Sequence, residues 1–278
     1  MLSGGEKMKL IDMHCHAFPD KIADHALHIL TQNCDYIPQT DGTMASTLRI
    51  QKEWGCKQFV LLNIATSPRA VRTANDFLIE HNDNRHIFSF GSICPGFSDY
   101  KAELDRLERA GIKGIKFHSG YQNFPMDSKE MYPLYEEIAK RDMILLFHGG
   151  YDPGFPDLDY YDPYRARHLA DDFKGAKIIL AHMGNCMSNR ETMKHLLGTD
   201  VYFDVSMAAV EMPKQEMEQL IKAHGVEKFL YGTDCPWSSG IETQNRIRSL
   251  NLLNEDKEKI FYKNAAKLLN INEGEVEE

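Results

Sequence analysis

Two histidines separated by one residue lie near the start of the chain, in the segment Asp12-Met13-His14-Cys15-His16. Side chains alternate along a strand with a period of two, so His14 and His16 would point to the same side. The preceding Leu10 and Ile11 are apolar, as expected of a buried strand entering such a site. Two imidazoles that converge from one strand end indicate half of a metal site. Other strand ends must then supply the missing ligands.

The elements that could position these residues are eight short apolar runs, which alternate with amphipathic helical segments. The runs are continuously apolar rather than alternating, which predicts parallel strands covered on both faces. Eight such strands are the number that a single (β/α)8 TIM barrel requires. We expect the strands at residues 10–14, 58–64, 87–93, 112–118, 144–148, 177–182, 201–205 and 228–232.

The remaining segments divide into predicted helices, irregular stretches and ends. Thr43 could cap a helix running to about Trp54, and Asp127 or Ser128 could cap another. Residues 256–269 predict a C-terminal helical extension packed on the barrel. Two stretches, 17–41 and 149–162, look irregular, and both follow strand ends. We expect a disordered lead-in at 1–8, the barrel at 9–270, and a solvated, disordered acidic tail at 271–278.

Composition limits the function classes. The 278 residues are 42% hydrophobic and 26% charged, which is ordinary for a globular protein. The net charge of −9 argues against a nucleic-acid partner, which would favour a basic patch. We find no run that could span a membrane and no signal peptide. The 6 scattered cysteines predict reduced thiols in a cytoplasmic protein.

The carboxyl ends of the predicted strands carry residues that can bind a metal. Beyond the first strand these are His118, His148, His182 and Asp234. Catalytic residues of eight-stranded barrels gather on this face. Histidines and a carboxylate with room for water describe a catalytic metal site rather than a closed structural one.

This arrangement resembles the amidohydrolase superfamily, most closely its amidohydrolase-related branch of metal-dependent TIM-barrel hydrolases and decarboxylases. The resemblance covers about residues 9–270. It implies that His14, His16, His148 and Asp234 hold one divalent metal ion, with His182 beside it as a catalytic group or further ligand. The segments that carry it are Ile11–His16, Gly114-Ile115-Lys116-Phe117-His118, Phe147-His148-Gly149-Gly150, Leu180-Ala181-His182-Met183-Gly184 and Tyr231-Gly232-Thr233-Asp234-Cys235-Pro236-Trp237.

These residue types allow hydrolytic chemistry. A divalent ion activates water and polarises a carbonyl, Asp234 is the candidate general base, and His182 could stabilise the developing oxyanion. Lys116 could contact a substrate carboxylate as an ammonium, which we favour, or could bridge two metals as a carboxylated lysine. His118 then faces the substrate, and Trp237 forms an apolar wall or packs in the core. Zinc is the expected ion, with manganese as the alternative.

Three functions fit these motifs. The leading hypothesis is a metal-dependent hydrolase of a small amide, lactone or ester. The alternative is a lyase, a non-oxidative decarboxylase or hydratase of a small unsaturated or aromatic acid. The third is a non-catalytic barrel with a structural metal site. We expect a small-molecule substrate, with a carboxylate as one option, and no nucleic-acid or membrane partner; a monomer and a homo-oligomer both fit.

Overall fold

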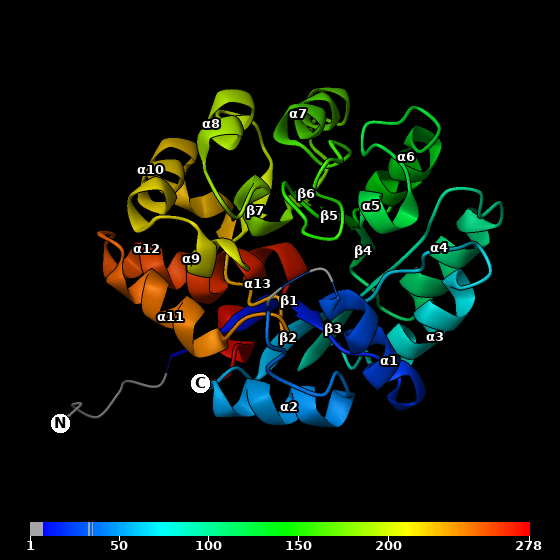
Figure 1. The fold of residues 1–278 in the computed structure, drawn as a ribbon, viewed down its shortest axis with the longest axis horizontal. Coiled ribbons are helices and arrows are strands. Elements are labelled where there is room, and N and C mark those ends of the chain that lie inside the picture. Colours follow the sequence, from blue (N-terminus) through cyan, green and yellow to red (C-terminus); the bar gives the residue numbers. More distant parts are fainter. Residues whose placement is uncertain (1–7, 33, 35) are drawn as a thin grey trace.

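The chain folds as a (β/α)8 barrel, as the apolar runs predict. The computed structural model describes residues 8–32, 34 and 36–278. Eight parallel strands follow one another in chain order around the sheet. Figure 1 shows the helices as a ring around these strands, in chain order from α2 to α11. The strands are β1 Ile11–His16, β2 Gln58–Leu62, β3 Ile87–Gly91, β4 Gly114–Phe117, β5 Ile144–Phe147, β6 Ile178–Leu180, β7 Tyr202–Asp204 and β8 Phe229–Leu230.

Backbone hydrogen bonds between β1 and the segment after β8 close the barrel. The amide of Met13 donates to the carbonyl of Tyr231, and the amide of Asp234 donates to the carbonyl of His14 at 2.8 Å. One residue further on, Cys15 and Cys235 form an isolated parallel bridge. Closure therefore brings Asp234 beside the two histidines of β1.

The helices cover the outside of the barrel, and four short turns join them. Among the described residues, no helix is long and apolar enough to cross a membrane. The helices are α1 Asp20–Thr31, α2 Met44–Glu53, α3 Val71–His81, α4 Tyr100–Arg109, α5 Ser119–Gln122, α6 Tyr132–Lys140, α7 Pro163–Asp172, α8 Arg190–Leu196, α9 Ala208–Glu211, α10 Lys214–His224, α11 Gly240–Ser249, α12 Asn254–Glu258 and α13 Asn264–Leu269. The turns are η1 Ala181–Gly184, η2 Val226–Lys228, η3 Lys259–Lys263 and η4 Glu273–Glu275.

Several local predictions can be compared with these bounds. The Thr43 side chain accepts a hydrogen bond from the amide of Ser46 and caps α2, as predicted. The predicted C-terminal helix is continuous from α12 to α13 through one π-helical turn. The helix expected to begin at Asp127 or Ser128 instead begins at Tyr132, after a run of tight turns.

Two predictions about irregular segments are wrong. Residues 17–41 contain α1, whose apolar residues Ile22, Ala26, Ile29 and Leu30 recur at helical spacing. The acidic tail is ordered rather than disordered, because Val276 is buried and the amide of Glu277 donates to Gln58 at 3.0 Å. Its solvation is as expected, since residues 272–275 and 278 are exposed. The predicted lead-in is residues 1–8; its first seven residues lie outside the described part of the chain.

The core surrounds the strands and supports their carboxyl ends. Aromatic side chains of β4 and β5 pack on α6: Phe117 lies 5.0 Å from Phe147 and 5.4 Å from Tyr135 between ring centroids. All three side chains are buried, and such contacts add to the stabilisation from burial. The polar residues at the strand ends therefore stand on a rigid floor.

Candidate metal centre and its pocket

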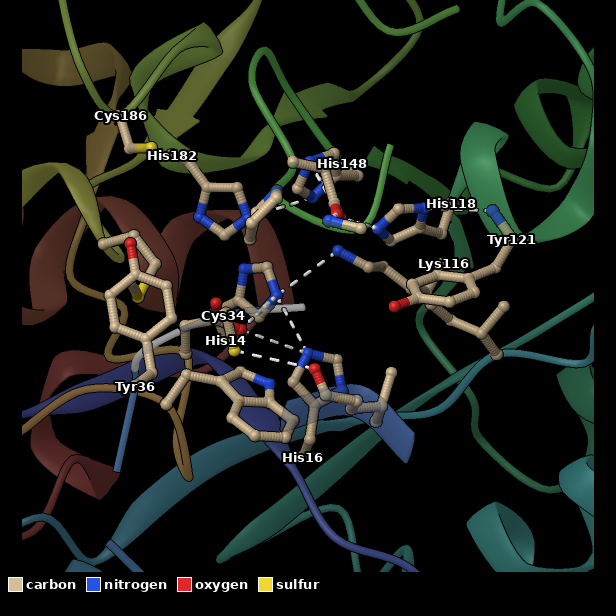
Figure 2. Close-up of a pocket in the computed structure, with 18 of the residues that line it drawn as sticks. His14, His16, Cys34, Tyr36, Lys116, His118, Tyr121, His148, His182 and Cys186 are labelled. Carbon is tan, nitrogen blue, oxygen red and sulfur yellow. Dashed lines mark hydrogen bonds and ion pairs between the residues drawn. The ribbon is translucent and has the colours of Figure 1, made fainter. Parts of the chain in front are cut away.

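The strand ends open into one pocket that holds every residue predicted from the sequence for the site. Its cavity measures about 250 Å³. Figure 2 shows the labelled histidines converging on it from different strands. The lining includes His14, His16, Lys116, His118, His148, His182, Asp234 and Trp237, together with Phe18, Leu30, Cys34, Tyr36, Asn63, Ile64, Thr66, Tyr121, Tyr151, Asp152, Pro153, Gly154, Cys186 and Met207.

Three of these residues form a compact group at the floor of the pocket. The Nε2 atoms of His14 and His16 lie 3.1 Å apart. The Oδ1 atom of Asp234 lies 3.2 Å from each of them. Tetrahedral ligands at about 2.1 Å from a zinc ion are about 3.4 Å apart, so this spacing is close to what a metal requires. His148 belongs instead to a second group, with His118 and Asp152.

The hydrogen-bond partners of the two imidazole rings indicate that this group fits a cation. The Nδ1 atom of His16 lies 2.9 Å from the carbonyl oxygen of Leu62, to which it can only donate. The Nδ1 atom of His14 likewise donates to the Asp204 carboxylate at 2.9 Å. Burial lowers the pKa of His14 to about 4, so its ring is neutral. The neutral ring of His14 therefore turns its Nε2 lone pair toward Nε2 of His16 and the carboxylate of Asp234, and a cation between these three atoms would satisfy all of them.

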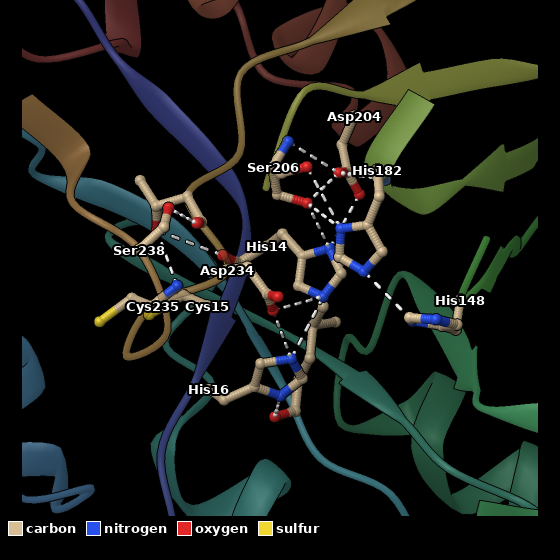
Figure 3. Close-up of polar contacts among 12 residues, drawn as sticks. His14, Cys15, His16, His148, His182, Asp204, Ser206, Asp234, Cys235 and Ser238 are labelled. Atoms are coloured by element: carbon tan, nitrogen blue, oxygen red, sulfur yellow. Dashed lines mark hydrogen bonds and ion pairs between the residues drawn. The ribbon is translucent and has the colours of Figure 1, made fainter. Parts of the chain in front are cut away.

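Asp204, at the end of β7, fixes the orientation of His14 and was missed in the sequence analysis. Figure 3 shows its carboxylate between His14, His182 and Ser206. Burial alone would raise the pKa of Asp204, but the contacts with His14, His182 and Ser206 together outweigh it and lower the pKa to about 2. A carboxylate that accepts the second ring proton of a ligand histidine is typical of metal centres.

Asp234 is held by its backbone as well as by its side chain. Its φ of 61° is left-handed, a conformation that non-glycine residues rarely adopt. The buried carboxylate of Asp12 accepts hydrogen bonds from the amide and the hydroxyl of Thr233, at 3.0 and 2.7 Å. Asp12 also accepts from the amide of His14, so one buried carboxylate joins the two segments that carry the candidate ligands.

The comparisons with known proteins bear on the family and the fold of the chain. The model of a family described as amidohydrolase matches residues 11–271. The chain belongs to the amidohydrolase family. No curated protein matched it.

Among solved structures, this amidohydrolase resembles 5-carboxyvanillate decarboxylase from Sphingomonas paucimobilis, with 17% identity, a TM-score of 0.68 and coverage of 95% of this chain and 100% of the other. It also resembles a dihydroxybenzoic acid decarboxylase from Polaromonas sp. JS666 with bound manganese, at 17% identity and a TM-score of 0.70, over 95% of this chain and 97% of the other. A third similar structure is a probable 2-pyrone-4,6-dicarboxylic acid hydrolase from Acinetobacter baumannii, at 15% identity and a TM-score of 0.63, over 95% of this chain and 100% of the other. At these identities the likeness shows the shared fold.

Lys116 is the cation closest to the three candidate ligands of the amidohydrolase. Its Nζ atom lies 3.3 Å from Nε2 of His14, to which the ammonium donates. Burial lowers the pKa of Lys116 to about 8, although the carboxylates of Asp204, Asp234 and Asp152 partly offset this effect. The side chain is therefore mostly charged at neutral pH and stands where a substrate oxygen or a second cation could be bound.

His182 and His148 form a chain of hydrogen bonds along the pocket wall. The Ser206 hydroxyl donates to Asp204, so it accepts from Nδ1 of His182 at 2.8 Å. Nε2 of His182 accepts from Nδ1 of His148 at 3.1 Å. Burial lowers the pKa of His148 well below its usual value, which leaves its Nε2 a bare lone pair with no hydrogen-bond partner.

His118 and Asp152 complete the far wall. Nε2 of His118 donates to Oδ2 of Asp152 at 3.0 Å, and Nδ1 accepts from the amide of Tyr121. Burial lowers the pKa of His118, so this ring is also neutral. Arg165 does not line the pocket and pairs with Asp127 and Asp159.

Proposed function

We propose that the protein is a metal-dependent hydrolase that acts on a small carbonyl compound such as an amide, lactone or ester. The observation that carries this proposal is the group of three converging ligand atoms, on His14, His16 and Asp234, at the floor of an open pocket. Three protein ligands with further positions open are typical of catalytic sites. We propose zinc as the ion, with manganese as the alternative, and His148 as a fourth ligand through its free Nε2.

A divalent ion held by these residues would lower the pKa of a water molecule and polarise the substrate carbonyl. The residues of the chain then have separate tasks. Burial alone would raise the pKa of Asp234, but His14 and His16 outweigh it and hold the pKa well below its usual range. Oδ1 faces the two imidazoles, so we assign Oδ2 as the acceptor of the proton from the attacking water.

We assign His182 as the second catalytic group. Its Nε2 faces His148 and must release that hydrogen bond before it can carry a proton to or from the substrate oxygen. The His182→Ala variant should lose about a hundredfold or more in turnover. Full turnover by this variant would remove His182 from the mechanism.

The metal requirement is tested by stripping the protein with a chelator and restoring zinc or manganese. Hydrolysis of amide, lactone and ester panels should vanish and return, and oxygen from labelled water should enter the product acid. His16→Ala should lose bound metal in elemental analysis, while His25→Ala, at an exposed histidine of α1, should retain it. Hydrolysis that survives stripping refutes the proposal.

One observation favours decarboxylation as a second candidate. Lys116 places a buried, mostly charged ammonium beside the candidate metal ligands, and such a group can bind a carboxylate. Two of the structurally similar proteins are decarboxylases of aromatic acids. Release of carbon dioxide from such an acid, with no incorporation of labelled water oxygen, would establish this candidate instead.

A further inference from the structure

The far wall of the pocket presents a carboxylate that the proposed hydrolysis does not use. Asp152 follows β5, lines the pocket and is 8% exposed. Its Oδ1 accepts from the amide of Gly154 at 2.6 Å, and its Oδ2 accepts from His118 at 3.0 Å. These two hydrogen bonds fix the carboxylate in one orientation, so it is a built feature rather than a mobile surface charge.

The partner of Asp152 is itself held rigidly. The ring of His118 stacks on His148, with centroids 4.2 Å apart, and meets Tyr121 edge-on at 4.6 Å. Because Nδ1 of His118 accepts from a backbone amide, its single ring proton lies on Nε2 and goes to Asp152. His118 therefore supplies Asp152 with a hydrogen bond but with no positive charge.

Asp152 can accept further hydrogen bonds, but the ring nitrogen that faces its Oδ2 atom across a gap, Nε2 of His148, is also an acceptor. Its Oδ2 lies 3.7 Å from Nε2 of His148, which has no hydrogen-bond partner. Among the described residues, the ion-pair partners of Asp152 within 4.0 Å are His118 and His148, both neutral rings. The charge of Lys116 reaches Asp152 from further away, but no cation contacts it among the described residues, so a hydrogen-bond donor placed against this buried carboxylate lowers the cost of burying it.

We propose that the Asp152–His118 pair is the specificity-determining site of this pocket and binds an amino or hydroxyl group of the substrate. The inference deepens the proposed function, since it names the substrate class as small carbonyl compounds that carry an N–H or O–H donor away from the reacting carbonyl. The ring of Tyr121 beside His118 offers an aromatic face to the group that carries this donor.

The test measures binding rather than turnover. Calorimetry with zinc-loaded protein compares 4-aminobenzamide with 4-methylbenzamide, which have nearly the same size but carry an N–H donor and a methyl group, respectively, at the same position. A hydrogen bond to a carboxylate predicts that the amino compound binds about tenfold more tightly to the unaltered protein. In Asp152→Asn, which keeps the size but removes the charge, the ratio should fall to about threefold or less.

Asp157→Asn is the matched control, because Asp157 is an exposed carboxylate of the same loop and does not line the pocket. It should keep the tenfold ratio. If Asp152→Asn fails to fold, Asp152→Ser replaces it and should show the same loss. Equal affinities in the unaltered protein, no binding of 4-aminobenzamide in the millimolar range, or a tenfold ratio that persists without Asp152 would overturn the inference.

The same comparison in metal-stripped protein separates this inference from the proposed function. The donor preference should persist there, because Asp152 and His118 do not depend on the ion for their hydrogen bonds. A preserved preference without any metal-dependent hydrolysis would refute the proposed function alone. Metal-dependent hydrolysis without the preference would refute the role of Asp152 alone.

Discussion

Replacing Asp204 by asparagine should weaken metal binding without removing any candidate ligand. The carboxylate accepts the Nδ1 proton of His14 at 2.9 Å and also two backbone amides, those of His182 and Ser206, each at 3.1 Å. Asparagine keeps the size and can still accept the amide protons through its oxygen. Its NH2 group then faces Nδ1 of His14, where two donors meet.

The magnitude follows from the proton on His14. The ring relieves the donor–donor contact by moving its proton to Nε2, the atom that faces His16 and Asp234. A protonated Nε2 cannot bind a metal ion. Loss of such an orienting partner weakens metal affinity about 10- to 100-fold, which corresponds to about 1.4–2.8 kcal/mol.

The assay is a competition for zinc between the protein and a chromophoric chelator at pH 7. Asp204→Asn should raise the dissociation constant about 10- to 100-fold. Asp200→Asn is the control, since that exposed carboxylate pairs with Lys228 at 3.5 Å and should bind zinc as the unaltered protein does. An Asp204→Asn dissociation constant within about twofold of the unaltered protein would refute the orientation argument.

Three further changes test the packing and charge of the barrel. Lys116→Met should raise the free energy of unfolding of metal-free protein at pH 7 by up to about 3 kcal/mol, because it removes a buried ammonium. The cost of burying that ammonium is complete below its pKa of about 8 and disappears as the pH rises toward 10.5, the pKa in the unfolded chain. Denaturant melts should therefore show that the stability gained by Lys116→Met shrinks above pH 8. Gly150→Ala should cost more than Gly175→Ala in the same melts, since both glycines have positive φ but a Cβ at 150 would lie 2.5 Å from a backbone oxygen, whereas one at 175 meets open space. Thr43→Ala should lower the free energy of unfolding by about 1 kcal/mol through loss of the cap of α2. An unchanged melting curve would mean that this cap does not stabilise the protein.

The barrel could be predicted from the sequence because its strands are buried on both faces. Each strand is then a continuous apolar run, and the parallel order puts all the carboxyl ends on one side. His14, His16 and Asp234 converge for this reason, although Asp234 follows His14 by 220 residues in the chain. It was therefore enough to know which residues end the strands to predict that the candidate ligands lie together.

The partners of these ligands could not be predicted in the same way. Asp204 ends a strand of three residues, between Phe203 and Val205, where a single aspartate looks like the start of a loop. Its contact with His14 joins residues 190 positions apart and depends on the exact register of β7. Which side chains touch across a barrel depends on how its strands are staggered when the barrel closes. No local sequence pattern predicts that stagger.

Helix α1 was missed although the sequence does carry a signal for it. Ile22, Ala26, Ile29 and Leu30 lie at i, i+4, i+7 and i+8, a pattern that indicates an amphipathic helix. The stripe that the helix buries is narrow, with Ala23 as its one fully buried residue and Ile22 and Ile29 about half exposed. Leu30 lines the pocket, so the overlooked helix forms part of the rim that a substrate must pass.

The balance of charge in the pocket separates the two candidate reactions. Asp152 and Asp234 line the cavity, and Asp204 is buried directly behind His14; together they carry three negative charges. Lys116 is the single lysine or arginine among the described residues that line the cavity. A divalent ion brings the total to zero, so a neutral amide leaves the site balanced whereas a carboxylate adds an uncompensated charge. Benzamide should therefore bind zinc-loaded protein more tightly than benzoate, measured by calorimetry at pH 7. Tighter binding of benzoate would mean that Lys116 and the ion act together on a carboxylate, which is the arrangement that a decarboxylase needs.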